Sequence, residues 1–112
     1  MLFRSRRDGD RHAWHLYVIR LALEGLSLDR AAVIERLAEA GIGTSVHFIP
    51  LHLHPYYQRE FGYRAGDFPN AERLYERSIS LPIWPGMTDS QIDRVAVTLL
   101  EILDAARRPV SV

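Results

Sequence analysis

The chain has 112 residues, and its content of 47% hydrophobic and 25% charged residues is that of one ordinary globular domain. Its formal net charge is zero, so the composition gives no electrostatic support for binding nucleic acid or a membrane surface. No apolar run approaches the roughly 20 residues that span a bilayer, and we expect a cytoplasmic protein.

Two residue types are absent from the sequence. The lack of cysteine excludes disulfides, thiolate metal sites and thiol nucleophiles in this chain. All 14 basic residues are arginine, and there is no lysine. A Schiff base with an aldehyde cofactor needs an amine whose pKa can be lowered, whereas arginine stays protonated. No side chain of this chain is therefore expected to bind such a cofactor covalently.

The N-terminal part of the sequence predicts a frayed terminus followed by a strand. Residues 1–11 carry arginines interrupted by Asp8 and Asp10, which is typical of a solvated end. Residues 12–23 alternate with a period of two, and both sides of the alternation contain apolar residues. This pattern predicts a strand that is covered on both faces over most of its length.

A helix and a second strand are expected next. Ser27 or Asp29 can cap the helix, and its apolar residues recur at three and four positions, as Val33, Ile34, Leu37 and Ala38. Gly41 stands where a helix commonly ends. The run 42–48 is β-branched and is followed by Pro50, which predicts a short strand.

The remaining segments predict an irregular region, two helices and a short extended piece. Residues 52–66 are rich in aromatic side chains and are expected to be irregular, with one helical turn. Residues 66–80 are typical of a helix with proline in its first turn, and residues 81–86 suit an edge strand or a loop.

The last helix begins with a capping box formed by Thr88 and Gln91. Its inward stripe is expected to consist of Ile92, Val95, Ala96, Leu99, Ile102 and Leu103. The order of elements predicts a two-layer α/β (α+β) domain with a small sheet over residues 12–106, followed by a tail at 107–112.

Three histidines, His47, His52 and His54, lie within eight residues. Zinc accepts three histidines and a water, but no aspartate or glutamate lies near them in the sequence, since Glu60 is the first one downstream, and the prolines disturb the alternation. Ser45 and His47 share one face of the predicted strand, yet no orienting acid is identifiable for a nucleophile and base pair. Ordinary packed or surface imidazoles are a third interpretation. The fourth is a pocket wall, where apolar area excludes water and a few polar groups orient a ligand.

Several motifs together resemble one known family. "HLYVIRL" at 15–21, "GIGTSVHFIPLHLHPYY" at 41–57 and "GDFPNAERLYERSISLPIWPGMTDSQIDRV" at 66–95 look like the C-terminal part of the DegT/DnrJ-type aminotransferases. These are pyridoxal phosphate (PLP) enzymes that act on keto-sugars carried by nucleotides. The resemblance covers nearly the whole chain, with the segments in the family's order.

The resemblance implies a fold-type-I architecture in which a small C-terminal domain closes over a large domain that binds PLP. The large domain would supply the Schiff-base lysine and the other cofactor contacts, so this chain would hold no catalytic, cofactor-binding or metal-binding residue of its own. Its implied partners are a PLP-binding N-terminal domain and a nucleotide-sugar substrate, and the full-length protein is expected to be a homodimer.

The resemblance also implies which residues touch substrate. His52 matches the best candidate position, followed by His47, Tyr56 and Tyr57, while His54 and Tyr63 rank lower. A neutral imidazole could hydrogen-bond a sugar hydroxyl or a phosphate oxygen. The reaction implied for the complete enzyme is transfer of an amino group to a keto-sugar, although some relatives catalyse dehydration. A stand-alone interaction or regulatory module derived from this domain is the alternative function.

Overall fold

The computed structural model describes residues 9, 11 and 13–108. In chain order the elements are β1 (Tyr17–Arg20), the 3-10 turn η1 (Leu23–Gly25), α1 (Arg30–Glu39), the 3-10 turn η2 (Leu51–Leu53), α2 (Pro55–Phe61), α3 (Pro69–Arg77), β2 (Ser78–Leu81) and α4 (Asp89–Ala105). A small sheet with helices packed around it confirms the expected α+β class.

The sheet is smaller than the sequence predicts. β1 and β2 pair antiparallel, in a register that runs from Tyr17 opposite Leu81 to Arg20 opposite Ser78. The strand expected over 12–23 is thus limited to four residues, and His12 lies outside the described residues. η1 follows almost at once and turns the chain away from the sheet.

The strand expected over 42–48 is reduced to a single bridge. Ser45 exchanges both backbone hydrogen bonds with Ser80, at 3.1 and 2.8 Å, on the edge of β2 that β1 leaves free. Beyond Ser45 the chain leaves the sheet, and Phe48 is 77% exposed. The prediction of a regular strand is wrong because no other part of the described chain packs over the apolar residues after Ser45.

β1 is covered on one face only, which corrects the expectation of two covered faces. Ile19 is buried, whereas its neighbours Val18 and Arg20 are exposed. Such alternation is usual for a strand in an antiparallel sheet that has one solvated face.

The core lies between α1, α4 and β2. Val33, Leu37 and Ile79 are fully buried, and α1 packs against both α4 and β2. The other buried apolar residues are Ile19, Leu21, Leu26, Ile42, Leu99 and Ala106. Part of the inward stripe expected on α4 is exposed: Ile92, near the start of the helix, is 49% exposed, and Ala96 is exposed too.

The helix ends follow the sequence signals closely, with one exception. Asp29 caps α1 by accepting the Ala32 N–H at 2.8 Å, and Gly41 has the positive φ of +75° that a residue ending a helix often requires. The predicted capping box at Thr88 is present on α4. The helix expected over 66–80, however, ends at Arg77.

Strand pairing explains why that helix ends early. The Arg77 carbonyl accepts the Leu21 N–H at 2.9 Å, and the Ser78 hydroxyl donates to the Leu74 carbonyl at 2.7 Å. These contacts satisfy carbonyls at the end of α3, so the chain passes directly from helix to strand.

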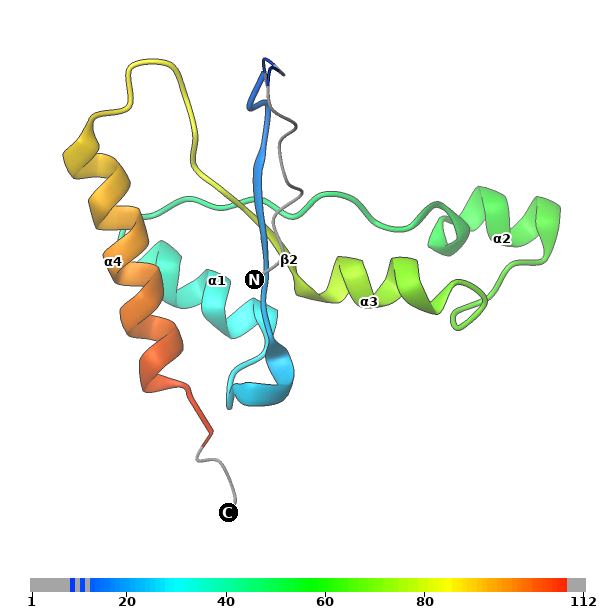
Figure 1. Ribbon diagram of the computed structural model, residues 1–112. Coiled ribbons are helices and arrows are strands. Elements are labelled where there is room, and N and C mark those ends of the chain that lie inside the picture. Colours follow the sequence, from blue (N-terminus) through cyan, green and yellow to red (C-terminus); the bar gives the residue numbers. More distant parts are fainter. Residues whose placement is uncertain (1–8, 10, 12, 109–112) are drawn as a thin grey trace.

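Residues 48–68, which we call the aromatic arm, extend away from this core. In Figure 1, α2 lies at the opposite end of the molecule from α4. The radius of gyration is 16.6 Å, well above the value of about 13 Å expected for a compact chain of roughly 100 residues. The arm therefore contributes little to the packed core.

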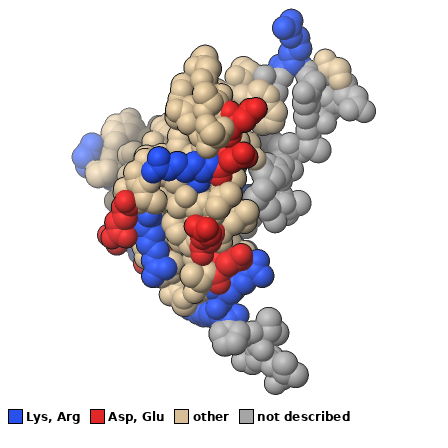
Figure 2. Space-filling view, turned by 90° about the vertical axis from the view of Figure 1, so that its left-hand side faces the viewer, with Lys and Arg blue, Asp and Glu red and all other residues tan. Residues whose placement is uncertain are grey.

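The surface carries charges of both signs. Figure 2 shows acidic and basic side chains interspersed over the face on the α4 side of the molecule. In the described part of the chain, no helix is both long and apolar enough to cross a membrane. The expected frayed terminus lies almost wholly outside the described residues. At the other end, Arg107 still pairs with Leu26.

Candidate functional site

His47 lies beside the end of the sheet, where it borders a hollow of about 200 Å³ that we call the imidazole hollow. Its Nδ1 is 2.9 Å from the buried Ser80 hydroxyl. The residues that line the hollow are His15, Leu16, Gly43, Thr44, Ser45, His47, Ser80, Leu81, Pro82 and Ile83. The hollow thus combines apolar walls with imidazoles and hydroxyls, which is the usual composition of a small-molecule site.

One polar atom of this wall lacks a partner in the part of the chain that the structure describes. The Thr44 hydroxyl oxygen is buried without a hydrogen bond to the described part of the protein. An unpaired buried polar group costs free energy, so native structures usually satisfy it with a ligand, a water or another protein group. Among these polar groups, His47 is the half-buried one that borders the hollow, whereas the Thr44 and Ser80 hydroxyls lie behind it.

The imidazole hollow does not fit PLP as a covalent cofactor. Its lining contains no amine and no carboxylate, and the sequence contains no lysine. The groups present can orient a ligand and exchange a proton at His47, but they cannot form a Schiff base with an aldehyde.

His52 lies elsewhere, in the aromatic arm. It is only 5% exposed, and its Nε2 is 2.7 Å from the Glu72 carboxylate on α3. Its ring centroid is 4.8 Å from that of Phe68. The Gly66 N–H donates to the same Glu72 oxygen at 2.8 Å. His52 therefore links η2 to α3 and to the turn before it.

The Glu72 carboxylate is stabilised in its charged form. The hydrogen bond from His52 lowers its pKa most, and the Gly66 N–H lowers it further, while desolvation opposes both. The side chain remains one-fifth exposed, so water still reaches the pair. A linked imidazole and carboxylate of this kind holds the arm in a defined position against α3.

Tyr56 and Tyr57 occupy the first turn of α2. Tyr56 is 56% exposed, and the two rings meet edge to face with centroids 5.3 Å apart. Tyr57 also stacks on Phe61 at 5.9 Å. The four predicted substrate residues therefore lie in three places: His47 at the imidazole hollow, His52 under the arm, and the tyrosines on its surface.

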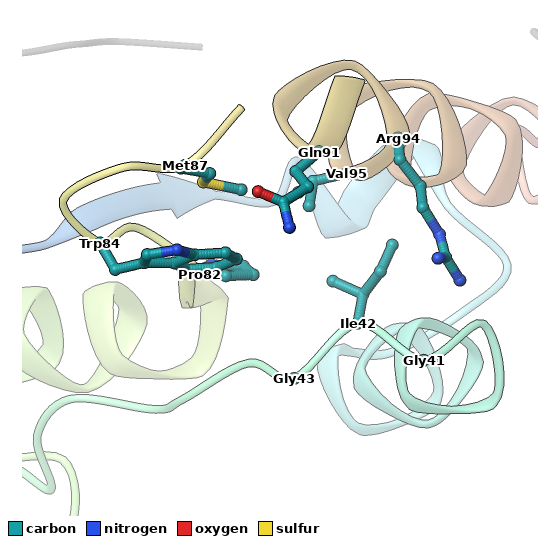
Figure 3. Close-up of a pocket in the computed structure, with 9 residues that line it drawn as sticks. All are labelled: Gly41, Ile42, Gly43, Pro82, Trp84, Met87, Gln91, Arg94 and Val95. Atoms are coloured by element: carbon teal, nitrogen blue, oxygen red, sulfur yellow. The ribbon is translucent and has the colours of Figure 1, made fainter. Parts of the chain in front are cut away.

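A second hollow of about 360 Å³ adjoins the first, because Gly43 and Pro82 line both. Figure 3 shows the carboxamide of Gln91 pointing into the space between Trp84 and Ile42. The Gln91 oxygen already accepts the Thr88 N–H at 2.9 Å, which leaves its amide hydrogens for a ligand.

Sequence reasoning missed Ser80 and Trp84 as lining residues. The signal for Ser80 was present, since Ser78, Ile79, Ser80 and Leu81 alternate polar and apolar side chains. Because the residues before Ser78 have a helical pattern, this alternation was included in the helix predicted over 66–80.

The three neighbouring histidines have three different partners. His47 meets Ser80, His52 meets Glu72, and the His54 Nε2 lies 3.3 Å from the Ile49 carbonyl. Within the residues described, no three histidine, aspartate or glutamate side chains are grouped to hold a metal ion. His47 also pairs with Ser80 rather than with Ser45, the neighbour considered in the nucleophile and base interpretation.

Comparison with known families matches residues 2–100 to the DegT/DnrJ/EryC1/StrS aminotransferase family. The chain belongs to this family. The match covers most of the sequence, including the imidazole hollow, the aromatic arm and α3. It confirms the resemblance found in the sequence motifs.

Three relatives illustrate the likeness. The spore coat polysaccharide biosynthesis protein SpsC of Bacillus subtilis is 48% identical over 100 residues, which cover 88% of this chain and 26% of SpsC. The PLP form of Spr1654 from Streptococcus pneumoniae is 31% identical, with a TM-score of 0.71 over 81% of this chain and 23% of Spr1654. PseC of Helicobacter pylori, an aminotransferase involved in the biosynthesis of pseudoaminic acid, is 25% identical, with a TM-score of 0.71 over 81% of this chain and 24% of PseC.

The chain thus spans about a quarter of the length of these relatives. The likeness in fold to PseC and Spr1654 concerns only that quarter.

Proposed function

We propose that this chain is the C-terminal, substrate-closing domain of a PLP-dependent aminotransferase that acts on nucleotide-linked keto-sugars in a cytoplasmic pathway of amino-sugar synthesis. The family match over residues 2–100 is the observation that carries the proposal. The existence of PLP and PMP forms of Spr1654 and the sugar chemistry named for PseC support it.

In this proposal the chain binds and encloses the substrate, and another domain of the complete enzyme supplies the cofactor chemistry. PLP acts as an electron sink when it is bound in the complete enzyme. The Schiff-base lysine and the PLP contacts would belong to a partner domain N-terminal to this one, because the chain contains no lysine. On its own the chain would be inactive.

His47 would contact the sugar. Its ring borders the imidazole hollow, and Ser80 fixes the ring through Nδ1. If Nδ1 is engaged in this way, Nε2 is the atom left to hydrogen-bond a substrate hydroxyl or to exchange a proton with it. On the same wall, Thr44 adds a buried hydroxyl that has no partner within residues 13–108.

The aromatic arm would form the outer part of the substrate site. Tyr56 and Tyr57 could stack on the nucleotide base or hydrogen-bond the ligand. His52 is more deeply buried and paired with Glu72, so its contact with substrate would require the edge of its ring, and its main contribution would be to position the arm. In the complete homodimer this arm would meet another protein surface.

A chimaera tests the proposal. This chain would replace the matching C-terminal region of Spr1654, and the protein would be followed by absorbance as an amino donor converts the PLP form to the PMP form. Nucleotide-linked keto-sugars would then be screened for return to the PLP form. We expect both half-reactions to proceed, and we expect His47→Asn to slow the sugar half-reaction by about 10- to 100-fold while leaving the donor half-reaction nearly unchanged.

The matched control is Glu101→Gln, an exposed change on α4, away from the arm and the imidazole hollow. A folded chimaera that binds PLP but returns no keto-sugar to product would contradict the proposal. Equal effects of His47→Asn and Glu101→Gln would contradict the role of His47.

The exposed aromatic arm also favours a second function, a stand-alone interaction module. Phe48 is 77% exposed and Phe61 is 59% exposed, and exposed apolar patches often mark interaction surfaces. This function predicts that the isolated chain binds a second protein through the arm, and that Phe61→Ser abolishes binding. The inactive chimaera described above would favour it over the aminotransferase proposal.

A further inference from the structure

A hollow of about 460 Å³ lies at the other end of the sheet from His47, between the end of β1 and α3. Three arginines line it, Arg20 from β1 and Arg73 and Arg77 from α3, and the Asn70 side chain joins them. We call it the arginine hollow. Its lining contains no acidic residue.

The spacing along α3 explains this charge separation. Arg73, Leu74 and Arg77 follow Asn70 by three, four and seven residues, so the four side chains share one face of the helix. Glu72 and Glu76 lie on the opposite face. Glu72 is held there by His52, which keeps its carboxylate away from the arginines.

The two guanidinium groups on α3 are only partly neutralised by the residues that the structure describes. Arg77 pairs with Glu24 at 2.5 Å, but its Nε–H is buried without an acceptor among the described residues. Arg73 is exposed and makes no hydrogen bond or ion pair with any residue that the structure describes. The pKa of Glu24 is lowered, chiefly by the hydrogen bond from Arg77 and slightly by the charge of Arg73. Glu24 thus offsets one of the two α3 arginines and leaves Arg73 available.

We infer that the arginine hollow binds a small phosphate-bearing anion. Guanidinium groups present planar pairs of N–H donors that match phosphate oxygens, and arginines from two elements can hold more than one oxygen at once. A volume of about 460 Å³ exceeds what a lone carboxylate needs and admits a diphosphate with an attached group. This site does not depend on the proposed aminotransferase function, since a phosphate anion can bind without any reaction.

The test is a titration of the whole chain, followed by the NMR shifts of its backbone amides. The probes are inorganic pyrophosphate and uridine diphosphate, with uridine and sodium acetate at matched ionic strength as controls. We expect both phosphate probes to shift the amides of residues 20–22 and 70–77 in a saturable manner, and the two controls to leave them in place. Equal affinity for the two probes would show recognition of the phosphates alone, whereas tighter binding of uridine diphosphate would show an added contact with the nucleoside.

Arg73→Gln tests the residue at the centre of the inference. It should weaken pyrophosphate binding by about tenfold, because one charge-assisted contact is lost. Arg59→Gln on α2 is the matched control and should leave the affinity unchanged. The exposure of both side chains makes unfolding unexpected, and the NMR spectrum without ligand reports it directly. The inference is overturned if uridine or acetate shifts the same amides equally, if pyrophosphate shifts none of them, or if the two arginine variants bind alike.

Discussion

The packed core and the aromatic arm of this chain follow different rules. In the core, Val33, Leu37 and Ile79 are completely enclosed by α1, α4 and the sheet. In the arm, Phe48 and Phe61 remain mostly exposed although the segment is as rich in apolar side chains. The core buries its apolar side chains, whereas the arm leaves much of its apolar surface exposed to solvent.

This difference indicates a division of labour. Exposed aromatic rings lower solubility and add little stability. Such a segment is typical of a surface that binds another protein surface or a ligand. The core then serves as the support that fixes the imidazole hollow and the base of the arm. Variants in the two regions should therefore differ in what they change.

The largest effect is expected in the core. Leu37→Ala should lower the free energy of unfolding by about 2–5 kcal/mol, because it removes a fully buried side chain and leaves a cavity. Urea denaturation followed by circular dichroism measures this change. Leu100→Ala, at a site that is 58% exposed, is the control and should cost less than about 0.5 kcal/mol. Similar costs at the two sites would contradict the location of the core.

A smaller and local effect is expected at the junction of the two regions. His52→Ala leaves Glu72 without its main partner and should destabilise the attachment of the arm by about 1–3 kcal/mol. Hydrogen exchange should become faster in η2 and α2, with little change in α1 and α4. Uniformly faster exchange throughout the chain would show that His52 belongs to the core instead.

The sequence predicted the helix ends set by caps better than the pairing of the strands, for physical reasons. The caps at Asp29 and Thr88 and the end at Gly41 are local signals, which depend on a few neighbouring residues. The short pairing of Ser45 with Ser80 and the end of α3 at Arg77 depend on residues far apart in the chain, which no local pattern contains.

The sequence did not predict how the candidate site residues are arranged. His47 does line a hollow, as a pocket-wall residue should. The partner of His52, however, is Glu72, twenty residues further along. The sequence spacing of His47 and His52 could not show that they lie at different places. Side chains alternate between two faces only within a strand, and the proline-containing segment between the two histidines is not a strand.

Acid should weaken the junction in a defined pH range. Since the pKa of Glu72 is lowered in the folded state, its stabilising contribution is complete above the ordinary glutamate value of about 4.3 and is lost as the pH falls through the lower folded value. Exchange in α2 should therefore accelerate below about pH 4.3 in the unmodified chain. Glu72→Gln should remove this acceleration, whereas Glu76→Gln, on the exposed side of α3, should retain it. Identical acid profiles for all three proteins would contradict the role of the pair.

The smallest effect on stability is expected at the surface of the arm. Tyr56→Ser should change the free energy of unfolding of the isolated chain by less than about 0.5 kcal/mol, because the side chain is 56% exposed. In the Spr1654 chimaera the same change should raise the KM for the nucleotide-linked sugar. A large loss of stability in the isolated chain would show that the arm is part of the core.

The central claim is that this chain encloses a substrate and does not itself carry the cofactor chemistry. The isolated chain can be incubated with PLP and an amino donor, treated with borohydride and analysed by mass spectrometry of its peptides. The account predicts no stable adduct on any side chain and no aminated product, and a defined side-chain adduct or turnover by the chain alone would contradict it.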